Sequence, residues 1–541
     1  MTPVTSHAAP TRPRLATLAA TSIVLAVLAL LLTLWGDPLS LSLTGSSLKF
    51  ALGTVLLTLP PAIFTALLLY RTNLLGRSLL QTLLVVWLFL PIYVHIAGWR
   101  NLFGPQGWLE IASPFDPTAN LIDGWTGVLW LHSLAAFPWA VLLTGIAFGR
   151  GPAALEEDAR LDVSPLTVLL RVTLRRSWDA VLVAAVWVGI GVFGEMSIAS
   201  VCNVRTYAEV VFTGIPLGQT TTETGLTVAP GALVIIGLVL LAAWVAETVR
   251  PRTVDTPQRR PEPLPLGSQR WLWSLAVWLL FLAALAPPIV GLVYKVGITV
   301  DQIDGNFVRG WSLIKAIQLT FSSVIIYSTE LKWTLAIAGA VSIVTTLVGL
   351  LLADFATRTR IGPWCVSLFC AALFALPGPI VGLSIAWGTN RPWLAFAAPL
   401  VDRTIFAPVL AILTITLPIV TFYFWHALAS QQQLREMASL DGSSWWRTWT
   451  RVTLPGNVSM ICAGMLVGFV LAANDVAASV LVLPAGIDTI SRRIFGLLHF
   501  GGEDNVAGIL LMNLFAVAAI ATLIRYLAGR AGRTDFGDSL P

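Results

Sequence analysis

Long apolar runs constrain this chain more than any other feature of its sequence. A helix needs about 20 mostly apolar residues to span a bilayer, and its backbone polar groups must bond within the segment because no water is present. Charged residues make up only 11% of the chain, against about 25% in soluble domains. We therefore expect an all-α integral membrane protein with about twelve transmembrane helices, at 15–35, 48–70, 79–98, 124–149, 180–202, 230–249, 271–293, 331–355, 364–387, 406–427, 459–483 and 506–527.

The basic residues predict how these helices are oriented. With twelve spans, both termini lie on one side of the membrane, together with the loops near 71–78, 150–179, 250–270, 358–363 and 428–458. This side carries 22 of the 33 Lys and Arg residues. Loops rich in Lys and Arg stay in the cytoplasm, so both termini are expected there. The basic residues form no continuous stripe, which argues against a nucleic-acid partner.

A short polar segment occurs twice, about 280 residues apart, each time between apolar runs. The second copy extends from Leu434 to Pro455 and the first from Leu155 to Arg175. The copies match Glu157 with Glu436, Ala159 with Ala438, and Asp162 with Asp441. An internal repeat of this length predicts two pseudo-symmetric six-helix halves. The expected organisation is an N-terminal tail at 1–14, a first half at 15–250, a Pro-rich cytoplasmic linker at 251–270, a second half at 271–530 and a C-terminal tail at 531–541.

Signatures of enzymes are absent from the sequence. The chain has no Gly-x-x-x-x-Gly-Lys-Ser/Thr loop to hold ATP phosphates, no Gly-x-Ser-x-Gly elbow and no His-Glu-x-x-His pair. Its four Cys and five His residues are scattered, so no metal site is expected. We predict no catalytic residues, no cofactor and no ATPase site in this chain.

The second copy of the repeat resembles the signature of permease subunits of ATP-binding cassette importers. That signature reads Glu-Ala-Ala, three residues, Gly, nine residues, then Ile-x-Leu-Pro. The matching positions are Glu436, Met437, Ala438, Gly442, Val452, Leu454 and Pro455. The first copy departs from it, because Val163 replaces the Gly, Arg175 replaces the Pro, and one residue is missing between Asp162 and Arg171.

The resemblance implies that both copies are helix-turn-helix coupling loops on separate ATPase subunits, expected in two copies. It further implies a type I importer fold in a bacterial inner membrane, with substrate delivered by a periplasmic or lipid-anchored binding protein. The first loop is expected to take a different shape, because Val enters a left-handed turn less readily than Gly. The alternative classes are a secondary transporter driven by an ion gradient and, with no catalytic constellation to support it, a membrane-embedded enzyme.

Most of the chain, roughly 48–250 and 330–527, is similar to fused two-half permeases for ferric iron, thiamine and aminoethylphosphonate. Arg71-Thr72 with Gly76-Arg77, and Gly104-Pro105-x-Gly107, belong to that pattern. The stretch from Leu483 to Gly501 looks most like the iron(III) branch. Ferric iron is therefore the expected substrate, with thiamine or an aminoethylphosphonate as alternatives.

Two acidic residues lie inside apolar runs at equivalent positions of the halves. An offset of 280 carries Glu195 onto Asp475, which follows Asn474. An ionisable group inside a bilayer costs roughly 2.5–3.5 kcal/mol and usually faces a cavity or a partner. We expect Glu195, Asn474 and Asp475 to line a translocation path between the halves. The alternative is a structural hydrogen bond near a helix end.

Overall fold

The computed structural model describes residues 38–104, 107–109, 111–112, 120–149, 153–214, 230–231, 233–235, 237, 262–303, 306–359, 361–374, 376–389, 391–500 and 503–534. The first part of the chain forms α2 (Pro38–Arg71), α3 (Arg77–Leu88), α4 (Ile92–Phe103), α5 (Gly124–Phe148), α6 (Ala153–Asp162), α7 (Pro165–Val168), α8 (Trp178–Gly194), α9 (Ser197–Val201) and α10 (Tyr207–Gly214). The second part forms α12 (Arg270–Gly297), β1 (Ile298–Ile303), β2 (Asn306–Trp311), α13 (Leu313–Ile326), α14 (Ser328–Arg358), α15 (Gly362–Phe374), α16 (Gly378–Thr389), α17 (Ala398–Arg403), α18 (Phe406–Ser430), α19 (Gln432–Leu440), α20 (Trp445–Thr448), α21 (Leu454–Gly456), α22 (Val458–Ala473), α23 (Ile490–Phe500) and α24 (Glu503–Thr534).

The expected all-α membrane architecture is confirmed. Among the described residues, six helices are long and apolar enough to cross a bilayer, namely α2, α5, α12, α14, α18 and α24. Four bent helix pairs raise the number to ten if each pair is one span. The count of twelve stays a prediction, because 15–35 lies outside the described residues and 230–249 is described only in part.

Two of the predicted spans are broken rather than continuous. The range 79–98 contains α3 and α4, which meet at 97°, and the range 364–387 contains α15 and α16, which meet at 89°. Pro91 caps α4, and Pro377 directly precedes α16. A proline ring disfavours helical geometry at the residue before it, so each helix ends and a new direction begins. Pro138 and Pro418, by contrast, lie inside the unbroken helices α5 and α18.

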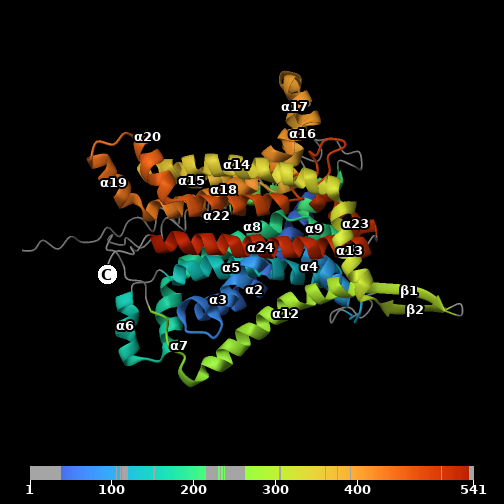
Figure 1. Ribbon diagram of the computed structural model, residues 1–541, viewed down its shortest axis with the longest axis horizontal. Coiled ribbons are helices and arrows are strands. Elements are labelled where there is room, and N and C mark those ends of the chain that lie inside the picture. Colours follow the sequence, from blue (N-terminus) through green and yellow to red (C-terminus); the bar gives the residue numbers. More distant parts are fainter. Residues whose placement is uncertain are drawn as a thin grey trace, which may run out of the picture.

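Two sets of three helices make up most of the bundle. Helices α2, α5 and α8 pack against one another, and α14, α18 and α22 do the same. Figure 1 shows the second set on one side of the molecule and α24 running across the middle. Helix α24 contacts α22, α12 and α3. The buried apolar side chains of both sets form the interior of the bundle.

Helix α12 packs mainly against α4 of the first half, and also against α24 and α13 of its own half. It crosses α4 so closely that a Cβ added to Gly98 would lie 2.4 Å from the Cα of Pro288. A Cβ on Gly291 would lie 2.0 Å from the carbonyl oxygen of Gly98. Small residues allow membrane helices to approach this closely. Just before α12, the backbone N–H of Leu264 donates to the carbonyl of Arg71 at 2.7 Å.

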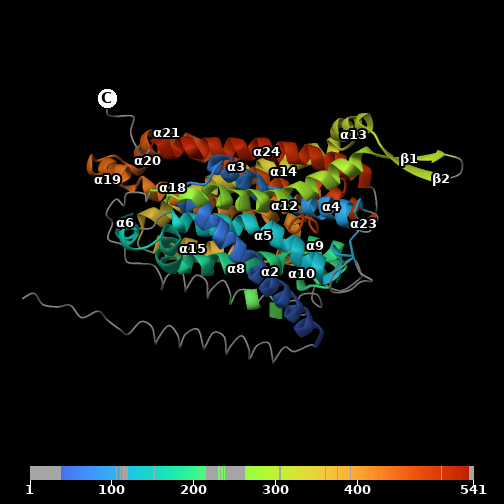
Figure 2. The same cartoon turned by 90° about the horizontal axis from the view of Figure 1, so that it is seen from below.

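The two ends of the bundle carry different structures. At one end, called here the hairpin end, β1 and β2 form an antiparallel hairpin that pairs Ile298 with Trp311. At the other, called here the motif end, lie α6, α7, α19 and α20 (Figures 1 and 2). Both copies of the repeated segment therefore lie at the same end of the molecule, as expected from their placement on one side of the membrane.

Candidate functional site

The second copy of the repeat folds as a helix, a tight turn and a second short helix. Helix α19 ends in a Schellman motif, in which the N–H of Ser443 donates to the carbonyl of Ala438 at 3.1 Å. Gly442 adopts a left-handed conformation with φ of +75°, which glycine enters at little cost. A Cβ at Gly442 would meet no atom within 4 Å. Backbone conformation rather than space therefore requires glycine at this position.

The first copy turns differently. Helix α6 ends at Asp162, and the N–H of Val163 makes an ordinary bond to the carbonyl of Ala159 at 3.1 Å. Val163 does not adopt a positive φ. The turn between α6 and α7 is two residues long, against four between α19 and α20. These differences confirm that the two loops have different shapes. The physical reason is that β-branched valine is strained in the left-handed region.

Beyond the turn, the two copies follow the same path. Ser164 and Ser444 cap α7 and α20, each accepting a backbone N–H at 3.4 Å. A π-helical turn follows in each copy, at Leu169–Leu174 and at Trp449–Thr453. The chain then bends by 70° into α8 and by 77° into α22. Each helix-turn-helix is thus joined directly to a long apolar helix.

The motif end presents apolar side chains outward. Leu434, Met437 and Leu440 follow one another at three-residue spacing on α19, and Leu440 is 86% exposed. Leu161 on α6 is 85% exposed. Contiguous exposed apolar groups are typical of interaction surfaces. The predicted coupling residues lie around them: Glu157, Asp162, Glu436, Asp441, Gly442, Leu454 and Pro455 are exposed, and Ala159 and Ala438 are half-buried.

Two buried ion pairs hold α6 and α19 at the motif end. Neither pair was predicted from the sequence. Glu156 of α6 pairs with Arg71 at the end of α2. Arg435 of α19 pairs with Asp354 of α14 and donates to Thr357 Oγ1 at 3.0 Å. Burial lowers the pKa of Arg435 below its ordinary value. The available signal was that the residue before each matched glutamate, at 156 and at 435, is charged.

Glu195 and Asp475 end the two long helices that start at the motif end. Glu195 accepts the backbone N–H groups of Ser197 at 2.6 Å and Ile198 at 3.0 Å. Asp475 accepts those of Ala478 at 3.4 Å and Ser479 at 3.1 Å. Within the described part of the chain, no hydrogen bond or ion pair joins the two acids. Each carboxylate caps the turn that follows its helix, which is the structural alternative considered for both.

The same two helix ends contact the broken helices of the other half. Asn474 Nδ2 donates to the carbonyl of Phe89 at 3.0 Å, beside the break between α3 and α4. Tyr93 Oη lies 3.3 Å from the carbonyl oxygen of Asn474. Reciprocally, a Cβ on Gly194 would lie 3.4 Å from the Cα of Pro377, at the break between α15 and α16. Asn474 therefore belongs to a contact between the halves.

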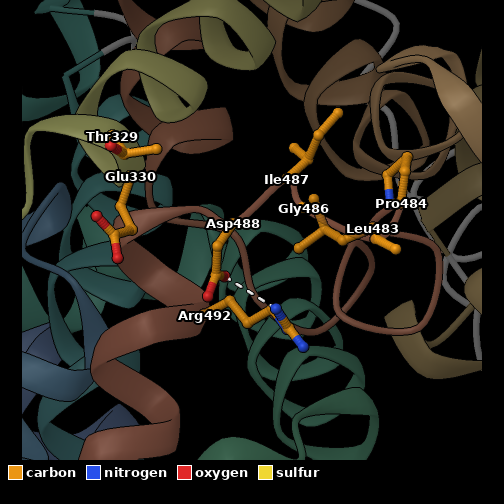
Figure 3. Close-up of a pocket in the computed structure, with 9 residues that line it drawn as sticks. Thr329, Glu330, Leu483, Pro484, Gly486, Ile487, Asp488 and Arg492 are labelled. Carbon is orange, nitrogen blue, oxygen red and sulfur yellow. Dashed lines mark ion pairs between the residues drawn. The ribbon is translucent and has the colours of Figure 1, made fainter.

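A pocket of about 370 Å³ opens at the hairpin end of α14 (Figure 3). Asp488 pairs with Arg492 across 3.1 Å, and Glu330 stands on the α14 side. The pocket contains Leu483 to Asp488 and Arg492, part of the stretch from Leu483 to Gly501. Its lining consists of Thr329, Glu330, Leu483, Pro484, Ala485, Gly486, Ile487, Asp488 and Arg492. Within the described ranges, no three His, Cys, Asp or Glu residues form a cluster that could hold a metal ion.

No protein-family model matches the chain, and no curated protein matches it.

Proposed function

We propose that this chain is the transmembrane permease subunit of an ATP-driven importer. Its two halves, of six transmembrane helices each, form one translocation path and are related by pseudo-symmetry, as in type I importers. The chain itself is not an enzyme. Two copies of a separate ATPase subunit dock at the motif end, and a periplasmic or lipid-anchored binding protein delivers substrate at the hairpin end. In this proposal the membrane is a bacterial inner membrane, with both termini in the cytoplasm.

One observation carries the proposal. Each copy of the repeat is a helix-turn-helix that presents apolar side chains outward and runs through a bend into α8 or α22. The far ends of those helices contact the broken helices of the opposite half, through Asn474 and Gly194. A displacement of the helix-turn-helix would therefore be transmitted along α8 or α22 to the contact between the halves. An ion-driven secondary transporter, the competing class, has no need for an exposed apolar surface at that end.

Ferric iron is the substrate that the proposal favours, with thiamine or an aminoethylphosphonate as alternatives. The support is the Leu483–Gly501 stretch, part of which lines the pocket with Glu330 and Asp488. Hard cations such as ferric iron prefer carboxylate oxygens. Both carboxylates have an arginine partner, Asp488 with Arg492 at 3.1 Å and Glu330 with Arg493 at 3.8 Å. A phosphonate anion would be repelled by the carboxylates unless these arginines were released to bind it.

The test is partner-dependent ATP hydrolysis by the complete complex with substitutions at Gly442. Gly442→Pro is incompatible with φ of +75°, because proline fixes φ near −65°, and we expect it to abolish coupled hydrolysis while membrane insertion persists. Gly442→Asn is the matched control, since Asn tolerates the left-handed region, and should keep most of the activity. ATP hydrolysis by the purified chain alone would refute the proposal.

A further inference from the structure

Buried ion pairs fix two helices at the motif end, α6 and α19, each to a spanning helix. Arg71, the last residue of α2, pairs with Glu156 of α6. Asp354, one turn before the end of α14, pairs with Arg435 of α19. Each of these four residues is at most 8% exposed. Breaking the Arg71–Glu156 pair leaves an uncompensated buried charge, so that contact resists separation. Asp354 has a second partner, since Arg358 Nε donates to its Oδ1 at 2.9 Å, and Arg435 is the buried charge left unpaired when the second contact opens.

The two contacts occupy the same place in the repeat but carry opposite polarity. Glu156 directly precedes Glu157, and Arg435 directly precedes Glu436. In the first half the helix at the motif end supplies the anion, and in the second half it supplies the cation. The spanning helix carries the complementary charge in both. The contact therefore recurs in both halves with its charges exchanged. Exposed ion pairs contribute little stability, but these two pairs are buried.

A third segment joins each contact. Thr173, in the π-helical turn before α8, donates its hydroxyl to Glu156 at 2.9 Å. Trp445, which begins α20, donates its indole N–H to Asp354 at 2.9 Å. In both halves the buried acid therefore ties together three parts: the helix at the motif end, the spanning helix, and the segment that leads into α8 or α22.

We propose that Arg71, Glu156, Asp354 and Arg435 are positioning residues. They lock the docking helices, α6 and α19, to the spanning helices α2 and α14. A displaced docking helix then moves α2 or α14 together with α8 or α22. The exchanged polarity makes the pairing of helices specific. If α6 packed on α14, Glu156 would lie beside Asp354, and if α19 packed on α2, Arg435 would lie beside Arg71. The anchoring stands on the geometry, whereas its part in transport rests on the proposed function.

The test exchanges charges without changing the net charge of the chain. In the variant Glu156→Arg with Arg435→Glu, like charges meet at both contacts. We expect backbone amides of α6 and α19 to exchange hydrogen about tenfold faster or more, measured by mass spectrometry on the full chain in lipid nanodiscs. Adding Arg71→Glu and Asp354→Arg exchanges the charges of both contacts. We expect slow exchange to return in α6 and to return only in part in α19, because Arg358, which pairs with Asp354 at 2.9 Å, then faces a like charge. The exposed neighbour provides the control, since Glu157→Arg should leave the exchange of α6 unchanged.

A smaller variant covers the case in which four substitutions prevent folding. Arg71→Glu with Glu156→Arg exchanges only the first contact and should protect α6 better than either single substitution does. Unchanged exchange in the like-charge variant, or no recovery in this exchanged pair, overturns the anchoring.

Uptake of radiolabelled ferric iron by cells with the complete importer then tests the link to transport. Uptake should fall about tenfold in the like-charge variant and recover in the exchanged pair. Normal uptake despite fast exchange of α6 and α19 would overturn the positioning role and leave the anchors in place. An absence of uptake by the unaltered importer would count against the substrate of the proposed function instead.

Discussion

Neutralising Glu195 and Asp475 tests whether charge at the ends of α8 and α22 serves a cation path. Each carboxylate accepts two backbone N–H groups, and an amide offers a single acceptor oxygen. Glu195→Gln and Asp475→Asn should each lose one hydrogen bond to a charged group, which contributes about 1.5–3 kcal/mol. If capping is the whole role, each variant should lose this amount of unfolding free energy.

A cation path adds a larger effect on transport. At an effective dielectric constant of about 20, a carboxylate about 4 Å from a monovalent cation stabilises it by about 4 kcal/mol. Losing one such charge should lower uptake at least tenfold, beyond any loss of folded protein. The charge-preserving variants Glu195→Asp and Asp475→Glu should keep most of the uptake, because a carboxylate still faces the same region.

The assay is uptake of radiolabelled ferric iron at matched amounts of protein in the membrane, with the thermal midpoint in detergent measured in parallel. Wild-type uptake in the double variant of Glu195→Gln with Asp475→Asn would refute the reasoning. Equal losses in the charge-preserving and neutral variants would do the same, because the loss would then follow the caps rather than the charge.

Three further predictions follow from other contacts. Charge reversal at Glu436 should lower uptake more than the same change at Glu157, because only the second loop keeps the left-handed glycine turn; equal losses would contradict this. Gly98→Ala should lower the free energy of unfolding by about 1–3 kcal/mol through overpacking against α12, whereas Gly339→Ala, where a Cβ meets nothing within 4 Å, should not; thermal midpoints decide. Asn474→Ala should cost about 1 kcal/mol by leaving the carbonyl of Phe89 without its side-chain donor, and an unchanged midpoint would show that this contact between the halves adds no stability.

The lengths of the apolar runs were sufficient to predict the long helices among the described residues but not their shape. The ranges 124–149 and 406–427 became the single helices α5 and α18 despite an internal proline in each. The ranges 79–98 and 364–387, which also contain prolines, broke into two helices. A proline removes one backbone donor in every case, and whether the helix survives depends on the neighbours that hold both flanks, which the sequence does not specify.

Local chemistry at the motif end could be predicted, but its anchoring could not. The Asp441-Gly442 pair indicated a turn, and Val163 indicated a different one, because backbone conformational preferences act over a few residues. The ion pairs Arg71–Glu156 and Asp354–Arg435 join residues 85 and 81 positions apart in the chain. Local sequence preferences do not select partners so far apart. The partners are selected when the helices pack and bury both charges together. The sequence alone thus determined the class of protein and the turns at the motif end, and only the tertiary structure decided where the long helices break and which helix each buried charge holds.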